Sequence, residues 1–428
     1  MRIIKYISVF SICLLNFNCE NDDDNKIINQ TLDPILTENI EVYNGNLINN
    51  SYTLAVENAG TKSYLLDKAG NRIKEWQFNS SLGNDLELLP EGKLLGLFKS
   101  DSPSITFGGY GGIVKIINSD GSIDWEYEYS SENYISHHDT ELLPNGNVLF
   151  IVWEKIDTIE AQANGVATSI PIYPETLIEI NPTNDQIIWQ WRSFDHIIQD
   201  EDNSLLNFGS VSNNPQLIDI NFDIVDNGDV MHANGIDYDQ VNDVIYLSVN
   251  YYSEIWVIDH STTTEQASTN IGGNYNKGGD LLYRFGNPSA YDNTEGTRLF
   301  YNNHFPNILE DNEPGAGNVL VYNNGNNNSQ SIVYELDIPN DFNLIPNTNN
   351  EPSIVWSFTD PDLFHGRISG AVRLKNGNTL ITEGDYGFWE VTNDGTIAWK
   401  YNGLGTYFWR SYSYELDSQE ILDLNLEE

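Results

Sequence analysis

The sequence is poor in cysteine: its 428 residues contain two, Cys13 and Cys19. Both lie in an N-terminal segment that carries Arg2 and Lys5 and continues as a short apolar run from Ile7 to Leu15. A charged start followed by a short apolar run is typical of an export signal too short to span a bilayer permanently. Once such a signal is removed, a single cysteine remains, which excludes an internal disulfide in the mature chain.

The apolar run ends at Cys19, which is followed by the acidic stretch Glu20 to Asp24. This segment resembles bacterial lipoprotein signals, and the acidic stretch resembles the surface-export tags of Bacteroidetes lipoproteins. We therefore expect residues 1–18 to be a signal peptide, Cys19 to be lipidated, and residues 19–40 to form an acidic flexible tether. The protein would then be an outer-membrane or cell-surface lipoprotein, with the periplasmic face and simple secretion as alternatives.

Basic residues are also scarce, with 20 lysines and arginines against 63 aspartates and glutamates and a formal net charge of −43. Such a field repels nucleic acids and anionic membrane surfaces. We expect no nucleic-acid partner, and contact with a membrane only through a lipid anchor. The acidity itself is explained by the solubility that an exported protein needs.

Neither a Pro/Gly/Ser-rich linker nor a break in composition divides the mature chain, although it is longer than a usual single domain. Repeat architectures escape this size limit because each unit packs only against its neighbours. The chain shows such a repeat: an alternating strand, a turn, an apolar strand, a third strand, and a closing strand centred on an aromatic residue. The six closing aromatics are Trp76, Trp125, Trp189, Tyr283, Trp356 and Trp399.

Four short strands per unit with almost no helical periodicity predict an all-β fold, a six-bladed β-propeller, as a single repeat domain over residues 41–415. The aromatic-rich segment Thr406 to Glu415 is predicted to be a closing strand that returns to the N-terminal side and completes the ring. Residues 416–428 are expected to form a disordered acidic tail. The long insertions of the third to fifth units are expected on one working face, with Ala161 to Ser169 and Asn323 to Ser331 as loop tips.

Histidines gather at one place in the repeat. His137 and His138 open the third unit ahead of the Pro144-Asn145-Gly146 turn, His232 opens the fourth and His304 opens the fifth. In the related hairpins, Asn84 and Ser369 occupy the position of His138, so the hairpin is shared and the histidines are not. His365 and Arg367 come just before the sixth unit.

Because the first strand of each propeller blade lines the channel, we expect His138, His232 and His304 to precede these strands and to converge at one mouth, with Asn250 close by. The alternative for any single histidine is a structural hydrogen bond to a neighbouring blade. Three histidines could also bind zinc or copper, and the Asp/Asn-rich loops could hold calcium. Gly108 to Gly112 is interpreted as a flexible turn between strands, and nothing indicates a nucleotide site.

Several strings of residues occur in a characteristic order: H-H-D-T-E-L-L-P-N-G-N-V-L-F, M-H-A-N-G-I-D-Y, N-N-H-F-P-N, and I-S-G-A-V-R-L-K-N-G-N-T-L-I-T-E-G. Together they resemble bacterial arylsulfate sulfotransferases, from about Ser51 to Tyr401. The resemblance implies a six-bladed propeller that moves a sulfuryl group from a phenolic sulfate ester to a phenol through a sulfated histidine, without a nucleotide sulfate donor. It implies His304 as the nucleophile and His138 and His232 as accessory active-site residues, with small aryl sulfates and phenols as substrates and no cofactor or metal.

One departure from the family pattern concerns charge. Where the family has an arginine after the second histidine's strand, this chain has Asn250. An amide can donate a hydrogen bond to a sulfuryl oxygen but brings no charge, and Arg367 is the candidate to replace it. We therefore take Asn250, Arg367, His137 and His365 as candidate substrate-binding residues. The alternative hypothesis is a non-catalytic surface lipoprotein whose propeller binds a ligand or partner, and a homodimer is compatible with either.

Overall fold

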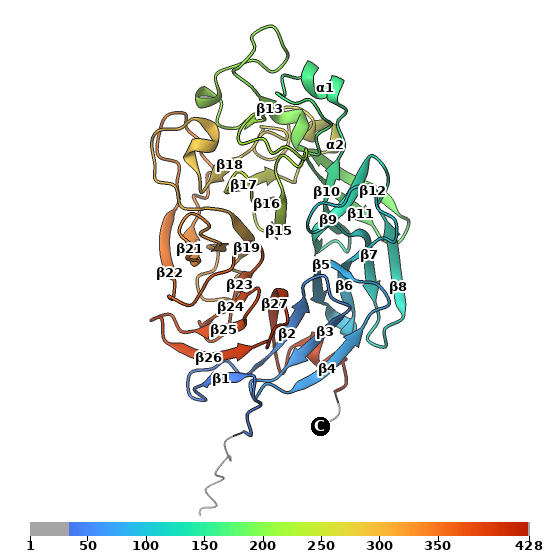
Figure 1. Cartoon of the computed structure of the whole chain (residues 1–428), viewed down its shortest axis with the longest axis vertical. Coiled ribbons are helices and arrows are strands. Elements are labelled where there is room, and N and C mark those ends of the chain that lie inside the picture. Colours follow the sequence, from blue (N-terminus) through green and yellow to red (C-terminus); the bar gives the residue numbers. More distant parts are fainter. Residues whose placement is uncertain (1–33, 427–428) are drawn as a thin grey trace, which may run out of the picture. The chain divides into compact units, whose positions relative to one another are not determined.

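The computed structural model describes residues 34–426, and residues 36–428 form one compact unit. The predicted signal peptide, Cys19 and most of the tether therefore lie outside the described residues. Within the described part, strands dominate and no helix is long and apolar enough to span a membrane. The predicted all-β propeller fold is confirmed (Figure 1).

The strands form units of four antiparallel neighbours, numbered here along the chain. The first three units are β27 (Phe408–Glu415), β2 (Ser51–Glu57), β3 (Lys62–Leu66) and β4 (Arg72–Gln77); β5 (Leu82–Leu88), β6 (Leu94–Lys99), β7 (Gly112–Ile117) and β8 (Ile123–Glu128); and β9 (Tyr134–Leu142), β10 (Val148–Glu154), β11 (Glu175–Asn181) and β12 (Gln186–Arg192).

The other three units are β15 (Ala233–Asp239), β16 (Val244–Val249), β17 (Glu254–Asp259) and β18 (Tyr283–Phe285); β19 (Asn303–Ile308), β20 (Val319–Asn323), β21 (Ile332–Asp337) and β22 (Ser353–Phe358); and β23 (Gly370–Arg373), β24 (Thr379–Glu383), β25 (Gly387–Val391) and β26 (Ile397–Asn402), with β1 (Ile40–Tyr43) on the outer edge. The innermost strands are β27, β5, β9, β15, β19 and β23, and each contacts the next unit around the ring (Figure 1).

The number of separate blades differs from the six expected. Four units are sheets of their own, whereas units 2 and 3 share one eight-stranded sheet. They are joined by a single parallel pair between Asn84 of β5 and His138 of β9. Both residues have a positive φ, 109° and 59°, which turns their peptide groups away from the regular strand direction. The two innermost strands therefore pair at this point instead of remaining separate.

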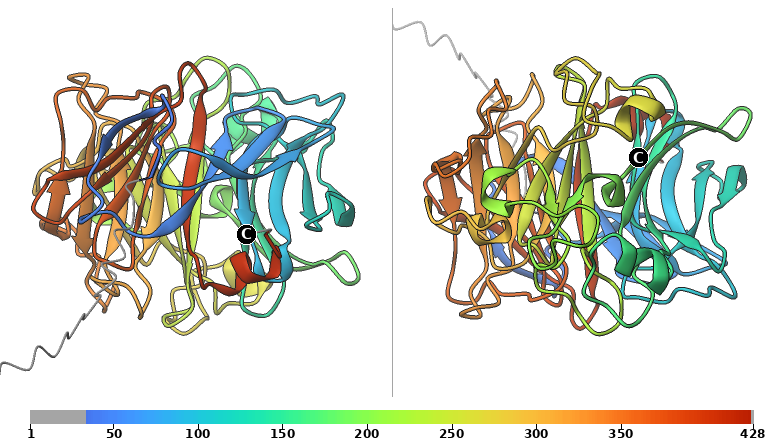
Figure 2. Two further views of the ribbon diagram at one scale, coloured as in Figure 1. Left: turned by 90° about the horizontal axis from the view of Figure 1, so that it is seen from below. Right: turned by 90° about the horizontal axis from the view of Figure 1, so that it is seen from above.

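The predicted closing strand is confirmed, because β27 pairs along its length with β2. The last long strand of the chain is thus the innermost strand of unit 1, and Figure 2 shows it running through the middle of the ring. At the other end of the described chain, β1 pairs with β26 and extends unit 6 at its outer edge. These two pairings cover strand edges that would otherwise be open.

The prediction that the acidic tail is disordered is wrong for its described part. The helix α3 (Gln419–Asp423) follows β27 (Figure 2), and both Ile421 and Leu424 are buried in an apolar cluster with Leu88 and Leu94. The Asp423 carboxylate accepts a hydrogen bond from the backbone N–H of Glu91, at 2.7 Å. Apolar residues on one face of an acidic segment were sufficient to fix it against unit 2.

The segments that connect the strands contain only short helices and strands. They are α1 (Thr158–Ala163), η1 (Pro90–Gly92), η2 (Ser193–His196), β13 (Ile197–Ile198), η3 (Val211–Asn213), β14 (Ile218–Asp219), α2 (Thr264–Ala267) and η4 (Pro288–Tyr291). Two predicted loop tips are therefore wrong in part. Ala161 is buried within α1, and Asn323 and Asn324 are buried at the end of β20.

Candidate active site

Four histidines from three neighbouring units form one cluster: His137 and His138 on β9, His232 just before β15, and His304 on β19. The rings of His138 and His232 lie with their centroids 4.8 Å apart. The indole of Trp409, on β27, lies 5.6 Å from the ring of His138 and 5.8 Å from that of His304. The structure thus brings the histidines of units 3, 4 and 5 together around one tryptophan of unit 1.

The predicted position of these histidines ahead of the innermost strands holds only for His232. His138 lies inside β9 at a register shift between β9 and β10, and His304 precedes a similar shift between β19 and β20. A regular strand sends neighbouring side chains to opposite faces, whereas a bulge breaks this alternation and re-aims them. The bulge explains how His137 and His138, adjacent in sequence, contact each other through their Nδ1 atoms at 2.8 Å.

Gly109 provides the space that His138 occupies. The backbone N–H of His138 donates to the carbonyl oxygen of Gly109 at 3.0 Å. A Cβ atom on Gly109 would lie 2.1 Å from the Nε2 atom of His138, and the φ of Gly109 is +85°. The predicted turn between strands is present, since Gly108 and Gly109 form a turn between β6 and β7, and this turn packs against the site, where Gly109 is needed for close approach.

The protonation of His304 is set by Asn324. The Nδ1 atom of His304 lies 2.7 Å from the Oδ1 atom of Asn324. The Nδ2 group of Asn324 donates to the carbonyl oxygens of His365 and Ile368, at 2.6 and 3.1 Å, which fixes the orientation of the amide. Nδ1 of His304 must therefore carry the proton, and its Nε2 atom keeps a lone pair with no partner among the described residues.

The charge of His304 is also decided by its surroundings. Burial lowers the pKa of His304 to about 3, the hydrogen bond that its Nδ1–H donates to Asn324 opposes this, and the charges of His232, Arg410 and His365 lower it further. The ring is consequently neutral at physiological pH, with Nε2 as a nucleophilic nitrogen.

His232 is the most accessible member of the cluster, with 18% of its side chain exposed. Its Nδ1 atom lies 2.5 Å from the Oδ2 atom of Asp229. Its ring stacks on that of Tyr251 at a centroid distance of 4.9 Å. With Nδ1 bound to Asp229, its Nε2 atom has no partner among the described residues.

His137 connects the cluster to a buried carboxyl group. Its Nε2 atom lies 2.8 Å from the Oε2 atom of Glu175, and its ring stacks on Trp153 at 3.6 Å. The other oxygen of Glu175 accepts from the backbone N–H of Ala233 at 2.7 Å. Burial and the nearby Asp229 raise the pKa of Glu175 well above its usual value. Burial and the charge of His232 lower the pKa values of both His137 and His138.

Asn250 lies beside the cluster, but its amide is already engaged. Its Nδ2 group donates to the carbonyl oxygen of Asn303 at 3.1 Å, and its Oδ1 atom accepts from Asn302 at 2.9 Å. Asn250 thus holds the backbone next to His304.

Arg367 is exposed, and its side chain has no hydrogen bond or ion pair among the described residues. The buried His365 accepts backbone hydrogen bonds at Nδ1 from Arg367 and Ile368, at 3.3 and 3.1 Å, so its proton is on Nε2. Burial lowers the pKa of His365, Asp385 opposes this, and Arg367 adds to it. Arg367 is therefore an available cation at the edge of the site.

A second cation near the site was missed in the sequence. Arg410 of β27 is buried, donates to the Oδ1 atom of Asp139 at 2.7 Å, and contributes to lowering the pKa values of His138 and His304. Trp409, Asn324 and Glu175 were missed as well. The aromatic-rich closing strand and the Asn-rich segment at Asn323 were visible signals, but they were assigned to ring closure and to a loop tip.

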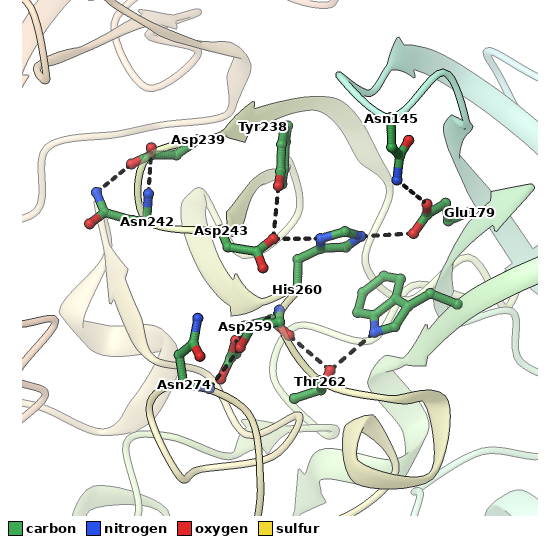
Figure 3. A network of polar contacts seen from close by, with 12 residues as sticks. Asn145, Glu179, Tyr238, Asp239, Asn242, Asp243, Asp259, His260, Thr262 and Asn274 are labelled. Carbon is green, nitrogen blue, oxygen red and sulfur yellow. Dashed lines mark hydrogen bonds and ion pairs between the residues drawn. The ribbon is translucent and has the colours of Figure 1, made fainter.

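The two remaining histidines, His260 and His196, make hydrogen bonds that hold parts of the fold together. His260 lies between the Asp243 carboxylate, at 2.7 Å, and the Glu179 carboxylate, at 2.9 Å, and so joins units 3 and 4 (Figure 3). His196 contacts Asp280 at 2.9 Å and the carbonyl oxygen of Ala267 at 2.7 Å.

An acidic cavity of about 640 Å³ lies at the far ends of the innermost strands, lined among others by Glu87, Glu141, Asp237 and Glu310. None of its lining residues is a histidine. Burial raises the pKa of Glu87 to about 8 and that of Asp237 to about 7, and Arg410 is a cation in the lining. Within residues 34–426, no three His, Cys, Asp or Glu side chains are arranged to hold a metal ion.

The sequence profile of the Arylsulfotransferase (ASST) family matches residues 27–402, which is most of the chain. A search of curated proteins finds no matching sequence.

Among solved structures, a protein of unknown function from Bacteroides caccae has 11% identity and a TM-score of 0.49, covering 85% of this chain and 99% of that one. The β-propeller domain of Cps50 (Swd1) from Myceliophteria thermophila has 10% identity and a TM-score of 0.41, covering 87% and 88%. A putative 6-phosphogluconolactonase from Bacteroides fragilis has 10% identity and a TM-score of 0.42, covering 86% and 98%.

Proposed function

The chain belongs to the arylsulfotransferase (ASST) family, and we propose that it transfers a sulfuryl group from a phenolic sulfate ester to a phenolic acceptor through His304, without a nucleotide donor. The observation that carries this proposal is the fixed tautomer of His304. A neutral ring with its proton on Nδ1 has a free lone pair on Nε2, and this lone pair can attack the sulfur atom of a sulfate ester.

In the first half-reaction, the Nε2 lone pair of His304 attacks sulfur, the bond between sulfur and the phenolic oxygen breaks, and that oxygen keeps the electron pair. The sulfated ring retains its Nδ1–H and becomes positively charged, and the Oδ1 atom of Asn324 stabilises it by accepting that proton in a hydrogen bond. In the second half-reaction, an acceptor phenol takes the group from Nε2 and restores the neutral ring.

The sulfuryl oxygens need donors while they are transferred, because much of the catalysis of such transfers is charge stabilisation. We assign this role to Nε2 of His232, when that ring carries both protons, and to the guanidinium of Arg367. Asn250 does not replace the family's arginine in this scheme. Its hydrogen bond to Asn303 makes it a positioning residue for His304.

A single-turnover reaction tests this proposal. With 4-nitrophenyl sulfate alone, the protein should release one equivalent of phenol in a burst and gain one sulfuryl group by intact mass, located on His304 by peptide mapping. His304→Ala should lose both signals. His260→Gln, which removes a histidine outside the cluster, should keep them. A folded wild-type protein without a burst on several aryl sulfates would contradict the proposal and favour the ligand-binding alternative.

We also propose that the protein is anchored to the cell surface through a lipid on Cys19. The basis is the apolar run that ends at this residue and the acidic stretch that follows. Metabolic labelling with a fatty acid should mark the wild-type protein and not Cys19→Ala. Equal labelling, or equal membrane association of the two, would contradict the anchor.

A further inference from the structure

Two buried groups beside the site have no part in the transfer as described so far, His137 and Glu175. They form a continuous hydrogen-bonded chain with His138: Glu175 Oε2 to His137 Nε2 at 2.8 Å, and His137 Nδ1 to His138 Nδ1 at 2.8 Å. All three side chains are at most 3% exposed. Burial without solvent contact makes the positions of the protons in this chain decisive for what His138 presents to the site.

The contact between the two Nδ1 atoms restricts these protons to two arrangements, because one nitrogen must donate and the other must accept. If Glu175 is an anion, it accepts from His137, His137 accepts from His138, and Nε2 of His138 has a lone pair. If Glu175 is a neutral acid, every bond reverses its direction, and Nε2 of His138 carries a proton.

The surroundings favour the neutral arrangement at rest. Burial disfavours a charge on any of the three groups, raising the pKa of Glu175 and lowering the pKa values of His137 and His138. The nearby Asp229 disfavours a second anion, and the nearby His232 disfavours a further cation. Nε2 of His138 has no hydrogen-bond partner among the described residues, and Gly109 packs beside it.

We propose that Glu175 and His137 are a proton relay that lets His138 give a proton to the departing phenolate and later take one from the acceptor phenol. This rests on the proposed function, which it deepens by assigning the general acid and base. Glu175 and His137 act through His138 and are positioning residues, whereas His138 itself contacts the substrate.

The protons and charges balance over the first half-reaction. As the bond between sulfur and the phenolic oxygen breaks, the Nε2 proton of His138 moves to that oxygen, the Nδ1 proton of His137 moves to Nδ1 of His138, and the carboxyl proton of Glu175 moves to Nε2 of His137. The products are a neutral phenol, a sulfated His304 and a Glu175 carboxylate. The N–H of Ala233, 2.7 Å from Oε1, stabilises that carboxylate. The acceptor phenol reverses all three transfers.

Glu175→Gln is a sharp test because the amide fits the same contacts. Its oxygen can accept from Ala233 and its N–H group can donate to His137, which keeps the resting tautomers, but it has no proton to give. The burst with phenyl sulfate, whose phenolate is a poor leaving group, should slow by about a hundredfold. The burst with 4-nitrophenyl sulfate, whose phenolate leaves without a proton, should stay close to that of the wild type.

Equal slowing with both esters would overturn the relay, since a purely structural defect does not depend on the leaving group. His137→Phe, which can keep the ring stacked on Trp153 but breaks the chain, should show the same dependence and serves if the glutamine variant does not fold. His260→Gln is the matched control for loss of a buried polar side chain elsewhere and should slow neither burst.

Infrared spectroscopy tests the relay without any substrate. The difference spectrum of wild type minus Glu175→Gln near neutral pH should contain the C=O band of a protonated carboxyl group. A carboxylate band instead would overturn the relay even if the sulfuryl transfer is real. Conversely, a protonated Glu175 in a protein without a burst would show that the proposed function fails while the proton arrangement stands.

Discussion

The Nδ1 atom of His304 and the Oδ1 atom of Asn324 lie 2.7 Å apart, and two backbone carbonyls leave that amide a single orientation. Through its Nδ2 group, Asn324 connects His304 of unit 5 to the segment before unit 6, and its Oδ1 atom determines which nitrogen of His304 can react. The residue that controls the proposed nucleophile therefore lies 20 positions along the chain, at the end of the neighbouring strand β20.

Replacing Asn324 should change the pH dependence of the burst. In the wild type, the burst rate should not depend on the protonation of His304 above about pH 5, because its pKa is lowered to about 3. Asn324→Asp keeps the hydrogen-bond acceptor but places a carboxylate beside Nδ1. The negative charge raises the pKa of His304, so the ring stays protonated, and unreactive, up to a higher pH than in the wild type. The variant's burst rate should then rise with pH through the neutral range. Unchanged pH profiles would contradict the assignment.

Gly109→Ala should slow the burst by displacing His138, since the new Cβ atom would lie 2.1 Å from its Nε2 atom. Gly121→Ala is a matched control, because Gly121 has nearly the same φ, +86°, with no atom near the new Cβ position. Both variants should lose about 1 kcal/mol of unfolding free energy from backbone strain. Equal burst rates in the two variants would show that the space at Gly109 is irrelevant to the chemistry.

Arg367→Gln removes the positive charge of the guanidinium and should destabilise the transition state. The rate constant of the burst should fall by about tenfold or more. The side chain is exposed and has no partner in the described chain, so the fold should be unaffected. Lys375→Gln removes an exposed cation at the other end of the innermost strands and should leave the burst unchanged. Stopped-flow detection of 4-nitrophenol separates the two; a similar small effect in both would indicate only long-range attraction.

Arg410→Met should destabilise the fold by about 3 to 5 kcal/mol near neutral pH, because it leaves Asp139 and the neighbouring Asp85 buried without their cation. Burial already raises the pKa of Asp85 to about 7, with Asp139 adding to it and Arg410 opposing it. The loss should therefore shrink at acidic pH, where both carboxyl groups take up protons. Urea unfolding at several pH values measures this, and a constant loss would contradict the pairing.

The contact of His260 with Glu179 and Asp243 should make stability depend on pH (Figure 3). Burial lowers the pKa of His260, but the hydrogen bonds to Glu179 and Asp243 outweigh it and hold that pKa above the ordinary 6.5. This stabilisation is therefore complete below about pH 6.5 and is lost as the pH rises through the folded-state pKa.

Glu179 behaves in the opposite way. Burial raises its pKa, but hydrogen bonds from His260, Asn147 and Asn145 bring it below the ordinary 4.5, so its contribution is lost as the pH falls through that lowered value. Wild type should exceed His260→Gln in thermal stability most between about pH 4.5 and 6.5. The difference between the two melting temperatures should shrink toward alkaline pH. A difference that grows there would contradict the ion pair.

The sequence by itself determined the type of architecture. Strand alternation, turns and the closing aromatics are local patterns, and they predicted an all-β propeller closed by Thr406 to Glu415. These patterns are visible in the sequence because successive side chains of a strand point to opposite faces, one buried and one exposed. The same local patterns located His138, His232 and His304 at the beginnings of successive units, which the structure brings into one cluster.

Tertiary structure alone decided which atoms meet. The bulge at His138 breaks the alternation on which sequence patterns depend, and it is this break that joins His137 to His138 and, with the pairing to Asn84, merges units 2 and 3 into one sheet. Glu175, Asn324 and Arg410 reach the cluster from other strands or units, at sequence separations that carry no periodic signal. These residues determine the tautomers and the charges of the clustered histidines through burial and hydrogen bonds. Such burial and hydrogen bonds exist only after the propeller has closed and water is excluded from the site.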